Sequence, residues 1–464
     1  MRDYIQKSVH TENYPSFNAL WHLQVMGVRD ANHQPNGWSA QRTGRTRVAM
    51  IDTSVAPSHP NLQGVIKSDL AIDLYSSRLG VFPYLDEDKL GHLDLNSNTS
   101  VAENLPGCKA LLVELNDRLT HGSLASVDGV QPMTSEAFSG HGTAIAGLIG
   151  ARPAVSKKHN DDVMAKQHDD LPLPYVGVDP ECEIVPISTN FDPEPRGLII
   201  ALLYAELIRA DVIVMPRIIP DPIREMAELN GHEHNGKPLA EVLAPVTYVD
   251  DDIALWKELT QLMVNISQAR PIVCAAGNSN EEFGIYPANL ASDDNGIISV
   301  GAVNAKGFIS GYSSANNITV HAPSDDSEVF DRSEIRLDER RDGYNPEGIP
   351  TQNANDKFSS FDIISTDVPG KFGYSGSAFG NEMDNGIMRE FGSYYCRFGG
   401  TSAASALIAG FLALGKTSGE LADTADGIAS KTWLLSKCKT LSDQDLQFRF
   451  PVWTNCVAPD FPDS

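Results

Sequence analysis

The stretch RVAMID at residues 47–52 indicates the fold class, and the rest of the sequence is interpreted outward from it. Four consecutive apolar residues stand between polar ends, a pattern typical of a short parallel strand buried on both faces. Similar runs recur along the chain, and segments with helical spacing separate them. Residues 196–209, for example, place several leucine and isoleucine side chains on one helical face. Strands that alternate with helices predict an α/β fold whose mostly parallel central sheet is covered by helices on both faces.

The other predicted strands and helices continue this alternation. Residues 139–151 open with glycine and histidine and continue with small and apolar residues, which suits a helix packed closely on a sheet. The remaining strands are predicted at residues 183–187, 211–215, 271–276 and 297–303, and the remaining helices at residues 251–270 and 401–414.

Three segments, residues 67–134, 153–173 and 324–357, interrupt the alternation. The first two have weak apolar periodicity, and the third carries ten acidic and five basic residues together with glycine and proline. Because none has enough periodic apolar residues for a core of its own, all three are predicted to be surface insertions, which at this length are usually functional or mobile. The expected organisation is a tail (1–13), a large domain with these insertions (14–430) and a C-terminal extension packed on or beside it (431–464).

The charge balance and the lack of a targeting pattern narrow the possible function classes. The 464 residues include 36 Lys and Arg against 61 Asp and Glu, a net charge of −25. Nucleic acids and anionic membranes attract concentrated Lys and Arg, so neither is expected as a partner. The N-terminal residues lack the apolar run of a secretory signal, and charged residues interrupt the most apolar region, 197–215. The chain is therefore expected to be cytoplasmic and not to span a membrane.

The distribution of the six cysteines agrees with a cytoplasmic location. They are scattered along the chain without a CxxC pair. In a reducing compartment they are predicted to be free and mostly buried thiols. Cys438 and Cys456, near the C-terminus, form the one pair for which a bridge stays open.

Four short motifs supply groups that can carry chemistry. Asp52 ends the first strand, a histidine lies in SGHGT (139–143), an asparagine ends AAGN (275–278), and a serine lies in GGTSAA (399–404). Taken singly, each motif has an ordinary interpretation as a turn or helix cap. Together they place an acid, a base, an amide donor and a hydroxyl at strand–helix junctions. Such junctions gather at the carboxyl edge of a parallel sheet, where these groups can converge.

These motifs, in this order, resemble those of the subtilases, the family of subtilisin-like serine proteases. The resemblance extends to GRTRVAMIDTSVAPSHPNL at residues 44–62 and to the YPAN and VGAV sequences within residues 286–303. It covers roughly residues 14–430, apart from the three insertions. It implies a subtilisin-like fold and a serine endopeptidase that acts on a protein or peptide substrate.

The resemblance also implies the role of each catalytic group. Ser402 is expected to attack the scissile carbonyl, His141 to accept and return the proton, and Asp52 to orient the imidazole. The Asn278 amide and the Ser402 backbone N–H are expected to bind the oxyanion. No metal or organic cofactor is expected. A structural calcium ion stays open, because many subtilases bind calcium, although no EF-hand spacing is present.

The substrate-binding residues depart from the usual family pattern. Pro216 has no N–H to donate to a substrate strand, and Ile218 and Ile285 stand where relatives commonly have glycine. A shallower primary pocket is therefore expected. Because an unrestrained broad protease would be toxic inside a cell, a narrow specificity, directed at one dedicated partner protein, is also expected. The substrate-binding residues implied by the resemblance are Met215, Pro216, Arg217, Ile218, Ala276, Gly277 and Ile285.

Two other functions stay open from the sequence. The altered substrate-binding residues allow a catalytically idle subtilase fold that serves as a binding protein. Long insertions over the active site would instead favour a transpeptidase or peptide macrocyclase, in which an amine resolves the acyl-enzyme in place of water.

Overall fold

The computed structural model describes most of the chain, with gaps in the predicted tail and in the three predicted insertions. The described residues are 19–42, 44–74, 100–121, 136–155, 172–189, 193–219, 233–234, 237–238, 250–326, 359, 361–368, 374, 394–454 and 459–462.

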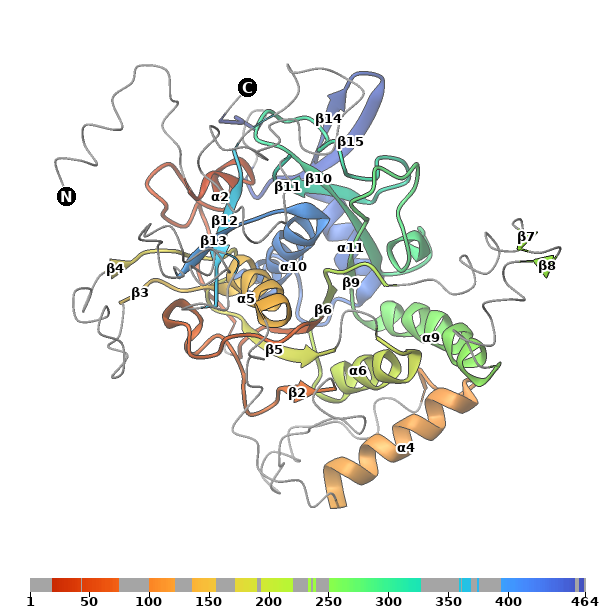
Figure 1. Ribbon diagram of the computed structural model, residues 1–464. Helices are drawn as coiled ribbons and strands as arrows, with labels where there is room; N and C mark the ends of the chain where they lie inside the picture. The colour runs from red at the N-terminus through yellow and green to blue at the C-terminus, as the bar shows by residue number, and fades with distance from the viewer. Residues whose placement is uncertain are drawn as a thin grey trace, which may run out of the picture.

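A seven-stranded parallel sheet forms the centre of the molecule (Figure 1). Its strands lie in the order β11-β10-β9-β6-β1-β5-β2, and every neighbouring pair is parallel, which confirms the predicted fold class. The strands are β1 (Arg47–Asp52), β2 (Ile72–Asp73), β5 (Glu183–Ser188), β6 (Val212–Met215), β9 (Ile272–Ala275), β10 (Ile297–Val303) and β11 (Val320–Pro323).

The sheet separates two apolar cores, because successive side chains of a strand point to opposite faces. In β1, Val48 and Met50 join one core, whereas Ala49 and Ile51 join the other. The first core is completed mainly by α5 and α10, and the second by α6 and α9, as predicted for a sheet covered on both faces. These helices are α5 (Glu136–Gly150), α6 (Pro195–Leu207), α9 (Asp250–Ala269) and α10 (Gly400–Ser418).

An additional helix, α4 (Pro106–His121), lies outside α6 and α9 (Figure 1). It falls in the segment 67–134 that was predicted to be a surface insertion. For α4 and for β2 that prediction is wrong, because β2 is an edge strand of the central sheet and α4 has a buried face. Leu111, Leu115 and Leu119 recur every four residues on that face and extend the second core.

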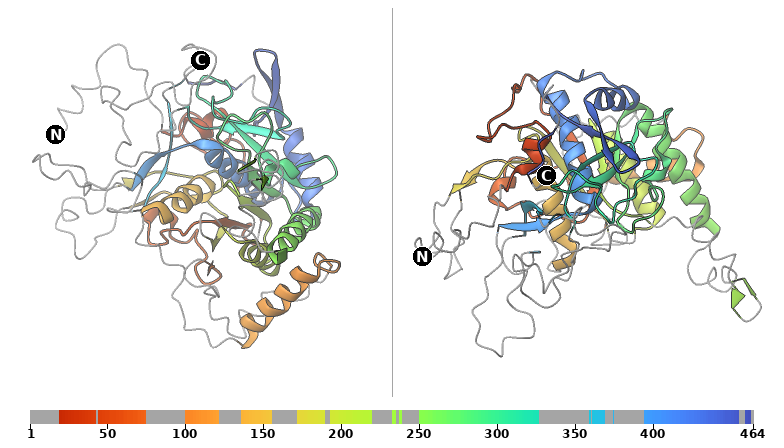
Figure 2. Two further views of the ribbon diagram at one scale, coloured as in Figure 1. Left: turned by 45° about the vertical axis from the view of Figure 1, so that its right-hand side comes forward. Right: turned by 90° about the horizontal axis from the view of Figure 1, so that it is seen from above.

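Smaller elements complete the described fold. Figure 2 shows the hairpin of β14 and β15 near the C-terminus, and β15 packs against β11. None of the helices among the described residues combines the length and the apolar character needed to cross a membrane. The remaining elements are α2 (Trp21–Val25), β3 (Ala154–Val155), β4 (Pro172–Leu173), β7 (Glu233–His234), β8 (Lys237–Pro238), β12 (Ile363–Thr366), β13 (Tyr395–Phe398), α11 (Gly427–Ser436), β14 (Cys438–Asp443) and β15 (Leu446–Pro451), with short 3-10 turns at Pro60–Leu62 and Ala288–Leu290.

The acidic segment predicted at residues 324–357 begins inside the protein. Ser324, Asp325 and Asp326 are all buried, with at most 4% of each exposed. For these three residues the prediction of a solvated surface is wrong. They directly follow β11, and Ser324 and Asp325 form hydrogen bonds with Gly400 at the start of α10. Residues 327–357 lie outside the described part of the chain, as do residues 156–171 of the insertion predicted at 153–173. The division into tail, domain and extension stays a prediction.

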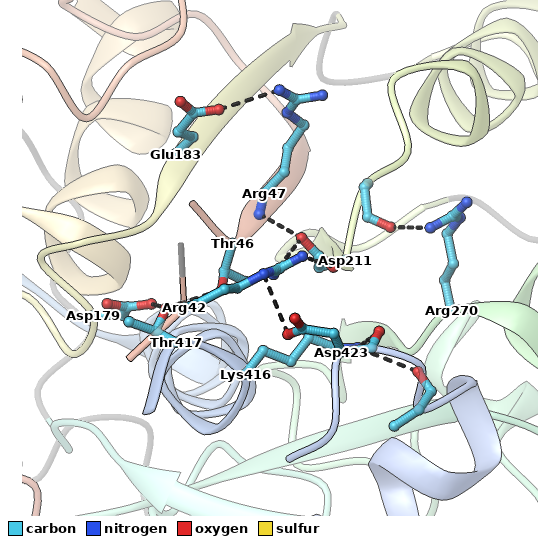
Figure 3. A network of polar contacts seen from close by, with 12 residues as sticks. Arg42, Thr46, Arg47, Asp179, Glu183, Asp211, Arg270, Lys416, Thr417 and Asp423 are labelled. Carbon is cyan, nitrogen blue, oxygen red and sulfur yellow. Dashed lines mark hydrogen bonds and ion pairs between the residues drawn. The ribbon is translucent and has the colours of Figure 1, made fainter. Parts of the chain in front are cut away.

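A polar network fixes the C-terminal end of α10 near the residues at which β1 and β6 begin (Figure 3). Thr417 Oγ donates to Asp179 Oδ2 at 2.7 Å, and the buried Lys416 ammonium donates to two backbone carbonyls of the segment that follows the helix. Arg42 forms an ion pair with Asp211 at 3.0 Å. Its backbone N–H donates to the carbonyl of Thr417, near the end of α10. The far end of α10 is therefore anchored, which restrains the position of its N-terminal end.

Two buried histidines without hydrogen-bond partners predict a pH-dependent stability. The rings of His22 and His321 have no partner among the described residues, and burial lowers the pKa of each to about 3. Below the ordinary value near 6.5, the unfolded chain binds protons that these rings exclude in the folded state. The free energy of unfolding should therefore fall as the pH drops from about 6.5 towards 3, by up to about 1.4 kcal/mol per pH unit for each ring.

The contribution of one ring can be isolated with His321→Leu, measured by urea unfolding from pH 7.5 to pH 4. The buried carboxyl groups of Asp179 and Asp326, whose pKa values burial raises to about 6 and 7, act in the opposite direction in both proteins. The variant should therefore lose less stability than the wild type as the pH falls. Parallel pH profiles would contradict this assignment.

Candidate active site

Three adjacent strands bring predicted site residues to one edge of the sheet. The strands β9, β6 and β1 are neighbours, and all three run in the same direction. Asp52 is the last residue of β1, Met215 is the last residue of β6, and Asn278 follows three residues after β9. The carboxyl ends of these strands therefore gather the three residues, and the positions of Asp52 and Asn278 agree with the junctions at which the sequence placed them.

The Asp52 carboxylate is buried and accepts hydrogen bonds from Thr53 and His141. Its two oxygens lie 2.8 and 3.0 Å from Nδ1 of His141. The N–H and hydroxyl of Thr53 also donate to its Oδ1, at 2.6 and 3.0 Å. Asp52 has no exposed surface, whereas 14% of the His141 side chain is exposed. A carboxylate group held in this way fixes the orientation of the imidazole and favours the tautomer with a proton on Nδ1, leaving Nε2 to act as the acceptor.

His141 lies inside α5, five residues after its start, and not at a helix start as predicted from the glycines around it. Gly142 is required here, because a Cβ atom would fall 2.5 Å from the backbone oxygen of Ser54. The Gly142 N–H also donates to Thr53 Oγ1 at 2.9 Å. Thr53 therefore joins the strand that carries Asp52 to the helix that carries His141, a role that the sequence pattern did not reveal.

Ser402 is the third residue of α10 and follows a turn made by Gly399 and Gly400. Gly400 has a φ of +73°, in the left-handed region that favours glycine. The side chain of Phe398, just before this turn, meets the ring of His141 edge-on at a centroid distance of 5.3 Å. Ser402 is 9% exposed, and the hydrogen bonds of the described residues include none between its hydroxyl and His141. Such bonds are often long before a substrate binds.

The side-chain oxygen of Asn278 anchors it to the turn just before Ser402, residues 399–401, which we call the nucleophile turn. The N–H and the hydroxyl of Thr401 donate to Asn278 Oδ1 at 2.9 and 2.8 Å, and the Gly277 N–H donates to Thr401 Oγ1 at 3.1 Å. Because Oδ1 accepts both bonds, the planar amide turns its NH2 group away from Thr401. Among the described residues, none accepts a hydrogen bond from that group. The arrangement leaves the amide free to donate to a substrate oxygen.

The comparison with protein families matches residues 44–450 to the model of the subtilase family. The chain belongs to the subtilase family. The match agrees with the resemblance of the four motifs and supports a serine endopeptidase. Among curated proteins the sequence comparison finds no match.

Solved structures that resemble this subtilase have low sequence identity to it. Fervidolysin from Fervidobacterium pennivorans, a keratinolytic enzyme, is 16% identical with a TM-score of 0.45, over 93% of this chain and 44% of that chain. A cold-adapted subtilisin-like serine proteinase is 14% identical with a TM-score of 0.44, over 94% of this chain and 98% of that chain. The PatG macrocyclase domain is 13% identical with a TM-score of 0.42, over 86% of this chain and 83% of that chain. This chain thus spans less than half of the length of fervidolysin.

The residues predicted to bind substrate in this subtilase divide into buried and exposed groups. Met215, Pro216, Ala276 and Gly277 are buried. Arg217 is also buried, 8% exposed, and its guanidinium donates to the Thr189 hydroxyl at 3.2 Å.

The two isoleucines at the predicted pocket differ in their surroundings. Ile218 is 48% exposed and does not join the core. Ile285 is only 7% exposed and covers Gly277, where a Cβ atom would lie 3.0 Å from Ile285 Cδ1. The Ile285 N–H donates to the carbonyl of Ala276 at 3.0 Å, so the two segments are locked together.

The expectations about metals and cofactors can be checked only against the described residues. Within them, no group of three or more His, Cys, Asp or Glu side chains is placed to hold a metal ion. Calcium also takes backbone carbonyl ligands. A structural calcium ion in this subtilase therefore stays an open prediction.

Proposed function

We propose that this chain is an intracellular serine endopeptidase that hydrolyses peptide bonds through an acyl-enzyme formed on Ser402. Family membership supports the reaction class. The observation that carries the residue assignment is the hydrogen-bonded pair of the buried Asp52 and His141, beside the turn that presents Ser402 and the anchored amide of Asn278.

The first half of the reaction forms the acyl-enzyme. His141 Nε2 accepts the hydroxyl proton of Ser402 while Oγ attacks the scissile carbonyl carbon. Asp52 stabilises the imidazolium that forms and does not itself take the proton. The Asn278 amide and the Ser402 N–H bind the oxyanion of the tetrahedral intermediate. His141 then gives its proton to the leaving amine, and the peptide bond breaks.

The second half of the reaction releases the acid product. A water molecule loses a proton to His141 and attacks the ester carbonyl, and the same oxyanion donors stabilise the second intermediate. The proton then returns to Ser402 Oγ. The same residues would serve a transpeptidase, in which a substrate amine takes the place of the water.

We also propose a narrow specificity directed at a dedicated partner protein. Ile285 lies over Gly277, and the exposed Ile218 follows Pro216, whose nitrogen has no hydrogen to donate to a substrate strand. The guanidinium of Arg217 is bound to Thr189, so it is not free in solvent. These features favour small P1 side chains.

The proposed intracellular location is supported by the state of the cysteines. Cys108, Cys182, Cys274, Cys396 and Cys438 are all free, and the first four are buried. Free thiols persist in a reducing compartment. Cys456, for which a disulfide with Cys438 stays open from the sequence, lies outside the described residues.

Two measurements test the proposed reaction. A fluorophosphonate probe should label the wild type at Ser402, and an unlabelled protein would indicate an idle fold. Product masses should show that each cleavage adds one water. Products joined without a gain of water would identify a transpeptidase instead.

A library of peptides that differ at P1 should reveal the narrow pocket. The wild type should cleave after alanine about 5- to 150-fold faster than after phenylalanine, because overpacking costs about 1–3 kcal/mol. Ile218→Gly should selectively raise cleavage after large residues. Val113→Ala, which changes an exposed side chain of α4, should leave the preference unchanged. Equal rates for alanine and phenylalanine in the wild type would contradict the proposal.

A further inference from the structure

The turn in front of Ser402 lacks a capping side chain of its own. The cap residue of α10 is Gly399, which has no side chain, and it is followed by Gly400 in the left-handed region. The first N–H groups of a helix need acceptors from elsewhere. The Thr401 N–H is bound by Asn278, so the open question is what holds Gly400.

Asp325 supplies the acceptor from the segment that follows β11. Its Oδ1 lies 3.2 Å from the Gly400 nitrogen and 2.8 Å from the hydroxyl of Tyr312. The Tyr312 oxygen itself lies 3.1 Å from the Gly400 nitrogen, so both groups accept from this N–H. Ser324 Oγ donates to the Gly400 carbonyl at 2.9 Å. The peptide groups on both sides of Gly400 are therefore held by side chains distant in sequence.

The Asp325 carboxyl group also fills the space that a side chain at Gly399 would need. A Cβ atom on Gly399 would fall 2.0 Å from the carboxyl atoms of Asp325. Asp325 is only 4% exposed, and burial raises the pKa of its carboxyl group. Burying such a group costs free energy unless its hydrogen bonds are made. Here the donors come from Tyr312 and from the backbone of the nucleophile turn, so the cost is offset at that turn.

We propose that Asp325, together with Tyr312, is a positioning residue that holds the Gly399–Gly400 turn and thereby sets the place of the Ser402 hydroxyl. The inference rests on the proposed function, in which Ser402 is the nucleophile. A misplacement of about 1 Å at a reacting group can cost about 10²-fold in rate. Side chains that fix two successive peptide groups before Ser402 therefore act on the acylation step.

The first test compares Asp325→Ala with Asp325→Asn. The alanine variant should lower kcat about 10- to 100-fold, with KM changed by less than about threefold, because it loses one of the two acceptors of the Gly400 N–H and leaves a void beside Gly399. Asparagine keeps an oxygen acceptor of the same shape and should restore most of kcat. The rate of fluorophosphonate labelling should follow kcat, since it reports the reactivity of Ser402 without peptide binding.

Asp326 provides a matched control. It is the next residue and is equally buried, at 4% exposed, yet its carboxyl oxygens accept from Ser359, Asn304 and Gly311 and not from α10. Asp326→Ala should therefore lower the thermal stability without lowering kcat per folded molecule. A loss of kcat of the same size in both alanine variants would overturn the proposal, because it would reflect general loosening of the loop.

Tyr312→Phe keeps the test decisive if Asp325→Ala does not fold. It removes one hydroxyl that touches both Gly400 and Asp325 and preserves the buried ring. A kcat reduced about 5- to 50-fold, with an unchanged KM, would support the proposal. Unchanged labelling rates in Tyr312→Phe and in both Asp325 variants would overturn it. If the wild type itself is not labelled at Ser402, the proposed function fails, and that outcome is distinct from a failure of the positioning role.

Discussion

Replacing Ser402 with alanine should lower the turnover of a cleavable peptide by roughly 10⁶-fold. The variant removes the only atom that can form the acyl-enzyme, while the residual rate comes from binding and the oxyanion donors. The fold should persist, because the Ser402 hydroxyl makes no hydrogen bond within the described structure and a small side chain replaces a small one. The measurement is kcat on any cleaved peptide, together with fluorophosphonate labelling.

Ser405→Ala is the matched control for this variant. Ser405 lies in the same helix, is fully buried, and donates to the Ser402 carbonyl at 2.8 Å. It should keep labelling and turnover within a few-fold of the wild type, since it takes no part in the proposed proton transfers. Full activity in Ser402→Ala would refute the mechanism.

Replacing Asn278 with alanine should lower turnover by roughly 10²- to 10³-fold with little change in KM. The amide NH2 group is proposed to donate to the oxyanion, which develops only as the carbonyl is attacked. The variant also removes the acceptor of the Thr401 N–H and hydroxyl. Its effect therefore combines a lost oxyanion donor with a loosened turn.

Thr401→Val separates these two effects. Valine has nearly the shape of threonine and keeps the backbone N–H that donates to Asn278 Oδ1. It loses the hydroxyl, which donates to Asn278 Oδ1 and accepts from the Gly277 N–H, so turnover should fall about tenfold or less. If Thr401→Val lost as much turnover as Asn278→Ala, the amide would act by holding the turn and not as an oxyanion donor.

The sequence already specified the central sheet and the identities of the reactive groups. The apolar runs at residues 47–52 and 297–303 coincide with the observed strands β1 and β10, because a strand buried on both faces has to be apolar at nearly every position. The order of Asp52, His141, Asn278 and Ser402 indicated the family that the family comparison then confirmed.

Local patterns were less reliable where packing decides the structure. The helix of His141 begins at Glu136, before the glycines that suggested its start. The helix α4 was missed although Leu111, Leu115 and Leu119 recur at helical spacing, because the segment around it has weak periodicity. That its apolar face packs against α6 and α9 is decided only by the fold.

What the sequence by itself determined is the parallel α/β fold, the family and the four chemical groups that the site requires. Only the tertiary structure decided which side chains hold those groups in place. Thr53 joins Asp52 to the helix of His141, Thr401 turns the Asn278 amide, and Asp325 is buried under the nucleophile turn although it begins an acidic segment. The physical reason is that hydrogen bonds across tens or hundreds of residues of sequence leave no periodic trace, and a carboxyl group reads as solvated until the fold supplies its donors.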